Sequence, residues 1–334
     1  MSTRDTIVLD ATDLKYLLID SLRLYSSNVV FLDGNNPYRF SSNKKEFFVL
    51  IKNVHESGAH RDNPDECRIQ IPKTANFNAP LSSGTEIVVL GYFADKKVFT
   101  AWNPFLLRAR FNERDTVSVY SRFSKQEQAA LQGIAVYIDK NNQKIISFKP
   151  EYLGLYLENI NKIHLLDESD LEELIKESDK LEDENIDGSI ELEGEKLTIT
   201  HTRYNRDPKF RKNVYDAYGH QCAMCGIQLQ LIEAAHIVPH SHEKGTDDVG
   251  NGICLCALHH TAYDQSLIYF NGSFDIKINH MKMDYLVKIG KDSGLNTFQK
   301  MQFEKIKLPK NHTLRPSIEN INLANNIRGI NTET

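Results

Sequence analysis

The sequence predicts an α+β protein with a β-rich N-terminal domain, an acidic linker and a C-terminal domain organised around a bound metal ion. Three observations predict this class. Short apolar runs separated by polar turns fill the first half of the chain, a strongly acidic stretch follows, and four of the five cysteines lie within residues 221–264. We place the N-terminal domain at 1–166, the linker at 167–196 and the C-terminal domain at 197–334.

The composition is that of a soluble globular protein. The chain has 334 residues, 40% of them hydrophobic and 25% charged, which is enough for two ordinary domains. No run approaches the ~18 consecutive apolar residues that a membrane helix needs, and the N-terminus lacks the basic and apolar regions of a secretory signal. The cysteines are clustered rather than spread as a disulfide framework, so we expect a cytoplasmic protein with no membrane partner.

The acidity of the chain is local. The net charge is −5, but residues 167–196 contain 14 acidic and 3 basic side chains, which leaves 31 acidic and 37 basic residues elsewhere. A charge run of this kind is typical of a solvated linker. The rest of the chain therefore carries a small positive excess, and a basic surface that faces phosphates is compatible with the composition.

An amphipathic helix over 10–26, capped by Asp10 or Asp13, is expected to open the N-terminal domain. Short β-rich runs with polar turns follow, and they indicate a curled sheet or a small barrel. The expected strands are 28–33, 47–54, 67–72, 85–94, 98–104, 117–122, 134–139 and 145–150.

Two further helices are expected to flank these strands. One covers 124–132, where Ser124 and Glu127 have the spacing of a capping box, and the other covers 152–166. This region contains no catalytic pattern: His55, His60 and Cys67 match no metal template and are interpreted as part of a loop between two strands. The single tryptophan, Trp102, is predicted to pack in the core rather than to stack on a base.

Two ligand pairs predict a structural zinc site in the C-terminal domain. Cys222-x-x-Cys225 and Cys256-x-x-His259 both have the two-residue spacing that lets two side chains reach one tetrahedral ion. Cys254 competes with Cys256, because alternation along a strand places both on the same face. A zinc ribbon without catalysis would explain these ligands.

A zinc ribbon alone does not explain three further polar residues in the order His236, Asn251, His260. With the zinc pairs, the segments AHIVP, NGI and LCALHH resemble the HNH endonucleases, which have a ββα-metal finger. The flanking FRKNVYDAYGHQC and HHTAYDQSLI look like a subgroup of predicted restriction endonucleases with this nuclease at the C-terminal end. The resemblance covers the last 140 residues or so and leaves the N-terminal part unexplained.

The resemblance implies a role for each of these residues. His236 is expected to act as the general base, Asn251 to fix the loop that orients it, and His260 to bind a catalytic Mg²⁺ or another divalent ion. His259 and His260 are about 100° apart on a helix, so one is expected to face the zinc and the other the cleft.

One departure concerns the metal ligands. Many members of the family have Asp or His directly before the base, where this chain has Ala235. Glu233 lies on the same face of the strand and is the first replacement we consider. Alternatively the metal binds weakly or the nuclease is inactive, although the intact His236, Asn251 and His260 argue against this. Loop residues are further candidate ligands: His240, His242, Asp247 and Asp248.

A basic helix is expected directly before the zinc pairs. Its apolar residues, Phe210 and Val214 among them, are spaced to pack on one side. The exposed cations are expected to meet DNA phosphates. These cations are Arg203, Arg206, Lys209, Arg211 and Lys212.

These features predict a metal-dependent DNA endonuclease of restriction or defence type that acts on duplex DNA as a homodimer. The N-terminal domain is expected to select the DNA, with modified bases among its candidate targets. Two alternatives stay open: a zinc-stabilised DNA-binding module without catalysis, and a nuclease effector activated by a small ligand. The acidic stretch has an alternative too, a mimic of DNA that shields the nuclease. A hairpin with its turn at Asn271-Gly272 and a terminal helix that packs on the finger are expected to complete the chain.

Overall fold

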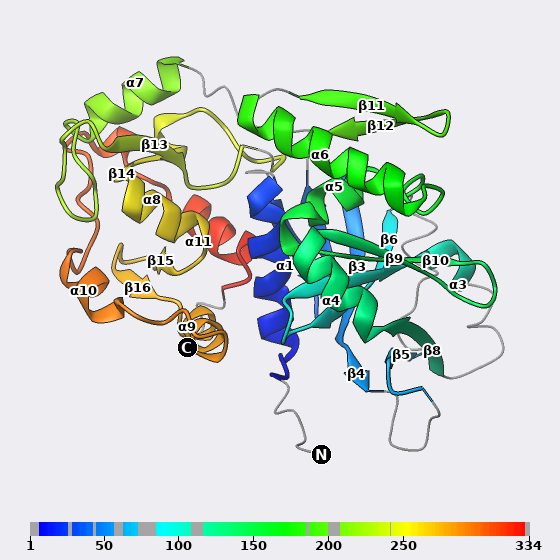
Figure 1. Cartoon of the computed structure of the whole chain (residues 1–334). Helices are drawn as coiled ribbons and strands as arrows, with labels where there is room; N and C mark the ends of the chain where they lie inside the picture. Colours follow the sequence, from blue (N-terminus) through cyan, green and yellow to red (C-terminus); the bar gives the residue numbers. More distant parts are fainter. Residues whose placement is uncertain are drawn as a thin grey trace. The chain divides into compact units, whose positions relative to one another are not determined.

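The computed structural model describes residues 7–25, 29–42, 45–56, 63–72, 85–107, 116–184, 187–199, 208–240 and 242–330 (Figure 1). The chain forms two compact units. The N-terminal unit contains Met1–Val29 and Asp33–Arg203, and the C-terminal unit contains Val30–Leu32 and Tyr204–Thr334. Whether the segments 1–166 and 197–334 fold independently stays a prediction.

A seven-stranded sheet forms the frame of the N-terminal unit. Strands β3 and β6 run parallel, whereas the pairs β2–β3, β6–β7, β7–β10 and β10–β9 are antiparallel. The end strands β1 and β9 do not pair with each other, so the described sheet is open and is not a closed barrel. In sheet order the strands are β1 (Val29–Gly34), β2 (Tyr38–Ser42), β3 (Lys45–Asn53), β6 (Glu86–Phe93), β7 (Val98–Trp102), β10 (Lys144–Phe148) and β9 (Ile134–Ile138).

A second, three-stranded sheet contributes to the same core. It contains β4 (His55–Glu56), β5 (Glu66–Pro72) and β8 (Thr116–Arg122). Apolar and polar residues alternate along β5 and β8, and the apolar ones pack against residues of β6 and β7. Trp102 is buried there and its indole N–H donates to the Tyr120 carbonyl, so the predicted core role of Trp102 is confirmed.

The expected loop with His55, His60 and Cys67 differs in the structure. His55 and Cys67 lie on the paired strands β4 and β5, and the Cys67 sulfur is buried beside Gln126. His60 falls outside the described residues. Within the described part of the chain, no group of metal-binding side chains includes His55 or Cys67.

Helices flank the sheets as expected, and one of the two predicted caps is found. Helix α1 (Ala11–Tyr25) is capped by a reciprocal pair, since the Asp10 and Asp13 side chains each accept from the other's backbone N–H. The predicted capping box at Ser124 is wrong. Ser124 lies inside α4 (Phe123–Gln132), and both its N–H and its hydroxyl donate to Asp65, the residue directly before β5. The remaining helical segments are α3 (Pro104–Leu107), η3 (Pro150–Tyr152) and α5 (Leu153–Glu158).

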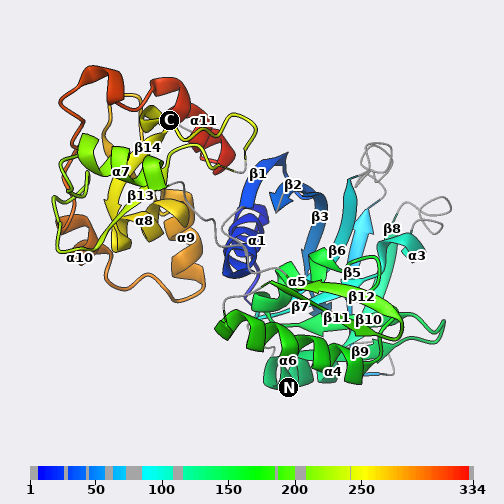
Figure 2. The ribbon, with the colours of Figure 1, turned by 90° about the horizontal axis from the view of Figure 1, so that it is seen from above.

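The acidic stretch is a folded part of the N-terminal unit and not a solvated linker. It forms α6 (Glu168–Glu184) and a hairpin of β11 (Gly188–Leu192) and β12 (Glu195–Ile199), which lies alongside α6 (Figure 2). Leu171 and Leu174 are buried, as are alternate residues of β12. The many carboxylates occupy the outward-facing positions of the same helix and hairpin, so the charge count alone did not indicate the buried apolar residues between them. The proposal of a DNA mimic stays a hypothesis.

The C-terminal unit is built on a β-hairpin followed by a helix. Strand β13 (Ile232–His236) pairs antiparallel with β14 (Gly252–Cys256), and α8 (Ala257–Asp264) follows directly. Helix α7 (Pro208–Ala217) packs against the hairpin, whose buried residues belong to one apolar core with those of α7 and α8. This is the ββα arrangement that the sequence predicts.

The remaining elements of this unit complete its core. The predicted hairpin is formed by β15 (Ile268–Phe270) and β16 (Ile276–Ile278), but its connection spans 271–275 because the Asn271 side chain accepts from two backbone N–H groups there. The terminal helix α11 (Ile318–Ile327) contacts β15, as expected. The short element η4 (Val249–Asn251) directly precedes β14. Between the hairpin and α11 lie α9 (His280–Lys288), α10 (Leu295–Lys300) and η5 (His312–Leu314). No described helix is both long and apolar enough to span a membrane.

Candidate functional site

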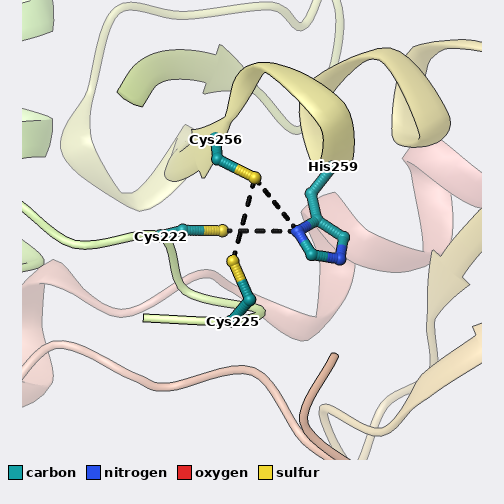
Figure 3. A group of neighbouring side chains, drawn as sticks. All are labelled: Cys222, Cys225, Cys256 and His259. Atoms are coloured by element: carbon teal, nitrogen blue, oxygen red, sulfur yellow. Dashed lines mark hydrogen bonds between the residues drawn. The ribbon is translucent and has the colours of Figure 1, made fainter. Parts of the chain in front are cut away.

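Four side chains from two segments converge in a Cys₃His cluster (Figure 3). Cys222 and Cys225 come from the turn before β13, whereas Cys256 ends β14 and His259 lies in the first turn of α8. The cluster's ligand atoms all lie within 4.8 Å of one another. Gly226 has φ of 76°, which lets the chain turn back after Cys225 and brings both sulfurs to one side.

The donor set of this cluster fits zinc. Tetrahedral Zn²⁺ with Zn–S bonds of about 2.3 Å places its ligand atoms about 3.8 Å apart. The Cys225 and Cys256 sulfurs are 3.8 Å apart, and His259 Nδ1 lies 3.7 Å from the Cys222 sulfur and 3.2 Å from the Cys256 sulfur. Three sulfurs and one imidazole are a ligand set that structural zinc sites use.

The structure separates the two cysteines that compete for the cluster. Cys254 faces its pairing partner Ala234 inside the apolar core, and burial raises the pKa of its thiol to about 12. Cys256 instead faces Cys222. A hydrogen bond between their sulfurs, with burial as the second cause, raises the pKa of the Cys256 thiol to about 11. The same hydrogen bond lowers the pKa of the Cys222 thiol. The cluster therefore contains Cys256 and not Cys254.

His236 lies at the end of β13 and is held from two sides. Its Nε2 atom is 2.8 Å from Asp247 Oδ1, and its ring stacks on Phe210 of α7 with 4.1 Å between centroids and 8° between planes. His240 approaches the other oxygen of Asp247, with 3.7 Å between Nε2 and Oδ2. Of the loop residues considered as metal ligands, Asp247 and His240 therefore lie beside His236.

Asn251 closes the loop between β13 and β14. Its side chain is buried, accepts from the Val238 N–H at 2.8 Å and donates to the carbonyls of Val238 and Thr246 at 3.0 and 2.9 Å. The Asn251 carbonyl also accepts from Ile237 N–H, next to His236. Both ends of the loop that carries Asp247 are thus tied to one buried amide.

His260 points away from the Cys₃His cluster and lies between two carboxylates. Glu233 of β13 contacts its Nδ1 atom, and Asp264, one turn later on α8, places Oδ2 3.1 Å from its Nε2. Ala235 is buried and contributes no ligand atom. His259 and His260 thus face different groups, as their helical spacing predicts.

Sequence reasoning missed Asp264 and Arg328. Asp264 follows His260 by four residues, a spacing that brings two side chains together on a helix and was the available signal. Arg328 is 4% exposed and follows α11. Its guanidinium donates to the Ile237 carbonyl at 2.9 Å, lies over the Tyr263 ring and has one nitrogen 4.0 Å from Asp264 Oδ1. No local pattern signals this long-range contact.

The other predicted residues fall in three groups. Lys209, Arg211 and Lys212 are exposed on α7, on both sides of Phe210 in the sequence. His242 accepts from the Lys244 N–H and Asp248 provides a backbone carbonyl to Asn251, so no described side-chain contact links either to His236 or His260. Arg203 and Arg206 lie outside the described residues.

Comparison with known proteins identifies the C-terminal region. Residues 222–271 match a family model described as HNH endonuclease, and they contain the Cys₃His cluster, His236, Asn251 and His260. The chain carries an HNH endonuclease domain. It is therefore a nuclease, and HNH nucleases use divalent metal ions. Helix α7, with Phe210, and Arg328 lie outside the matched part of the HNH domain.

Three further comparisons concern other parts of the chain or its full length. Residues 45–157 match a family model described as Methylase-associated X1. Among solved structures, the chain is similar to a modification-dependent TagI restriction endonuclease, with 12% identity, a TM-score of 0.27, and coverage of 83% of this chain and 80% of that one. A search of curated proteins finds no match.

Proposed function

We propose that this nuclease is a metal-dependent DNA endonuclease of restriction type, with His236 as general base and His260 as a ligand of the catalytic divalent ion. The observation that carries the proposal is that both histidines belong to one ββα finger, with His236 at the end of β13 and His260 in α8. Each of them contacts at least one carboxylate of the same unit. Phosphodiester hydrolysis needs a base for the attacking water and positive charge near the phosphate.

His236 suits the role of general base because its ring is fixed but not sealed off. The side chain is 13% exposed, so its ring can meet water while Phe210 and Asp247 set its orientation. Asn251 supports the base indirectly, since it ties the loop on which Asp247 lies. Its proposed role is to position the base, and it takes no part in proton transfer.

The divalent ion would be held by His260 together with one of the two carboxylates at its ring, Glu233 or Asp264, and the carboxylate at the opposite ring nitrogen would orient the imidazole. Carboxylate oxygens are the ligands that Mg²⁺ prefers, and two of them adjoin the His260 ring. Such an ion supplies positive charge for the phosphate and for the departing oxygen. The carboxylate on the metal side of His260 would replace the ligand that Ala235 does not provide, and Glu233, on the same strand as Ala235, is the first candidate.

The Cys₃His cluster would hold a structural Zn²⁺. It connects the turn before β13 with the start of α8, so one ion would fix the two segments from which the base and the His260 side chain project. Closed four-ligand zinc sites of this kind stabilise small folds that have little core of their own.

Helix α7 is the proposed contact with the DNA backbone. Phe210 stacks on His236, while its neighbours Lys209 and Arg211, and Lys212 after them, are exposed on the same helix. Cations on the helix that contacts His236 would hold a phosphodiester of the DNA next to the base. We include Arg203 and Arg206 in the proposed contact on the basis of the sequence alone.

The N-terminal unit is proposed to select the DNA, with modified bases as its candidate target. Support comes from the methylase-associated family model that covers 45–157. The full proposal is a cytoplasmic enzyme that cuts duplex DNA as a homodimer, because each strand needs its own active site.

The test is cleavage of two DNAs, one unmodified and one rich in modified cytosines, with Mg²⁺ or Mn²⁺. The proposal predicts cutting of at least one DNA by the parent protein, with a preference for the modified one, and none with EDTA. Absence of cutting on both DNAs, by a protein that holds zinc and binds DNA, would contradict it.

A further inference from the structure

We propose that Asp247 is the positioning residue of the base: it accepts the Nε2–H of His236 and thereby leaves the lone pair on Nδ1 as the atom that takes the proton from water. The inference rests on the proposed role of His236 and deepens it. Neither the HNH match nor the sequence pattern assigns this role to Asp247, which sequence reasoning considered only as a metal ligand.

The tautomer follows from the contact between the two side chains. The Nε2 and Oδ1 atoms are 2.8 Å apart, the length of a strong hydrogen bond. A carboxylate can only accept, so the contact is favourable when Nε2 carries the hydrogen. In a neutral imidazole the other nitrogen is then the acceptor. Asp247 therefore determines which ring atom is basic.

Phe210 fixes the remaining freedom of the ring. A hydrogen bond at Nε2 alone would still allow the imidazole to tilt about that contact. The Phe210 ring is nearly parallel to the His236 ring with 4.1 Å between their centroids, and His240 meets the His236 ring edge-on with 5.7 Å between centroids. With Nε2 and the plane of the ring both set, the direction of the Nδ1 lone pair is set too.

Asp247 is itself held in place by the loop. Asn251 donates to the carbonyl of Thr246, the residue before Asp247. Gly245 lets the loop cross closely over its own start, because a Cβ atom there would lie 2.2 Å from the Pro239 carbonyl oxygen. Asn251 thus acts on His236 through Thr246 and Asp247, which gives the central residue of the HNH pattern a physical connection to the base.

The neighbouring Asp248 provides a matched control. It carries the same charge in the same loop, and its described contact is a backbone carbonyl that accepts from Asn251 N–H. Changing Asp248 to Asn therefore alters the net charge by the same amount without removing a hydrogen-bond partner from His236.

The experiment combines ¹⁵N NMR of the histidine rings with cleavage kinetics on the full-length protein. The variants are Asp247→Ala, Asp247→Asn and Asp248→Asn, and His236→Ala assigns the His236 signals. At about pH 8, above the usual His pKa, the parent and Asp248→Asn should show the Nε2–H form of His236. Asp247→Ala should show a mixture of both tautomers.

Cleavage should follow the tautomer. We expect kcat to fall at least about 10-fold in Asp247→Ala, because both the tautomer and the orientation of the ring are lost, but by less than the roughly 10²- to 10⁴-fold that loss of the base itself would cause. The loss should be smaller in Asp247→Asn, whose side-chain oxygen can still accept, and less than about twofold in Asp248→Asn. KM and bound zinc should stay at the parent level in all three variants, which separates a change of the base from misfolding.

Two results would overturn the inference: an Nδ1–H form of His236 in the parent, or an unchanged tautomer and kcat in Asp247→Ala. Failure of the underlying function looks different. If His236→Ala cleaves as well as the parent, His236 is not the base, whatever the NMR spectra of the Asp247 variants show.

Discussion

Asp264 Oδ2 lies 3.1 Å from Nε2 of His260, and Glu233 contacts the opposite nitrogen of the same ring. A neutral imidazole has a single N–H, so only one of these two contacts can be an ordinary hydrogen bond. The other nitrogen then presents its lone pair to a carboxylate, which is favourable only with a cation between them. Either a second proton or a metal ion meets that need, and a carboxylate on the far nitrogen is the arrangement that orients histidine ligands of metals.

This relationship predicts a weaker metal site when either carboxylate is neutralised. Glu233→Gln and Asp264→Asn should each raise the Mg²⁺ or Mn²⁺ concentration for half-maximal cleavage by about 10- to 100-fold, the usual effect of losing a carboxylate partner at a metal site. Titration of cleavage against metal concentration measures this. Asp284→Asn, on an exposed position of α9, is the control. Equal metal dependence in all variants would exclude this ligand set.

The Cys₃His cluster predicts one zinc ion per chain. Cys225→Ala should lose that zinc and the ordered fold of the C-terminal unit, because closed zinc sites contribute directly to folding. Cys254→Ala changes a buried cysteine outside the cluster and should retain the metal. Elemental analysis and circular dichroism of the purified proteins measure both effects. Retention of zinc by Cys225→Ala, or its loss from Cys254→Ala, would show that the ligands are assigned wrongly.

The exposed cations of α7 predict a salt-dependent contact with DNA. Replacing Arg211 and Lys212 with Ala should weaken binding uniformly across sequences and reduce the slope of log K against log salt by about two, roughly 0.9 per phosphate contact. The matched control replaces Lys288 and Lys291, which are exposed on and after α9. Binding assays at several salt concentrations distinguish the pairs. The contact is absent if both double variants give the parent slope.

Buried His164 predicts an acid-sensitive N-terminal unit. Desolvation lowers its pKa from 6.5 to about 4, although its bond to the Lys144 carbonyl opposes the shift. The unfolded chain therefore binds more protons between those two values, and the free energy of unfolding falls as pH drops from about 6.5 to 4. At about 1.4 kcal/mol per pKa unit, His164 accounts for about 3 kcal/mol.

Urea unfolding followed by fluorescence measures this effect, since the only tryptophan of the sequence, Trp102, lies in the N-terminal unit. His164→Gln removes the titrating group. Between about pH 6.5 and 4, the free energy of unfolding of this variant should therefore decrease by about 3 kcal/mol less than that of the parent. An identical pH dependence in the two proteins would mean that His164 is not buried as a neutral group.

Much of the finger could be predicted because its signals are local. Two-residue spacing identifies Cys222, Cys225 and His259, and helical geometry separates His259 from His260. The same spacing to His259 favoured Cys256 over Cys254, and Cys256 is the one that lies in the cluster. Cys254 stayed a competitor because the two-residue alternation of a strand places both cysteines on one face.

The contacts that hold the site were less predictable. Asp264 was detectable from its spacing to His260, but Asp247 and Arg328 reach their partners through loop closure and packing of distant segments. The prediction of a linker at 167–196 was wrong for a different reason. Its charge count dominates the sequence, whereas Leu171 and Leu174, with the apolar residues of β12, decide that it packs against the N-terminal sheet.

The most direct test of the central claim is cleavage of the preferred DNA by the parent, His236→Ala and His242→Ala with saturating Mg²⁺ or Mn²⁺. His242 lies in the same loop and has no described side-chain contact with His236, so it controls for loss of a loop histidine. We predict that His236→Ala binds DNA and retains zinc but cleaves at least about 100-fold more slowly, whereas His242→Ala cleaves at the parent rate. Cleavage by His236→Ala at the parent rate would contradict the assignment of the base and with it the proposed mechanism.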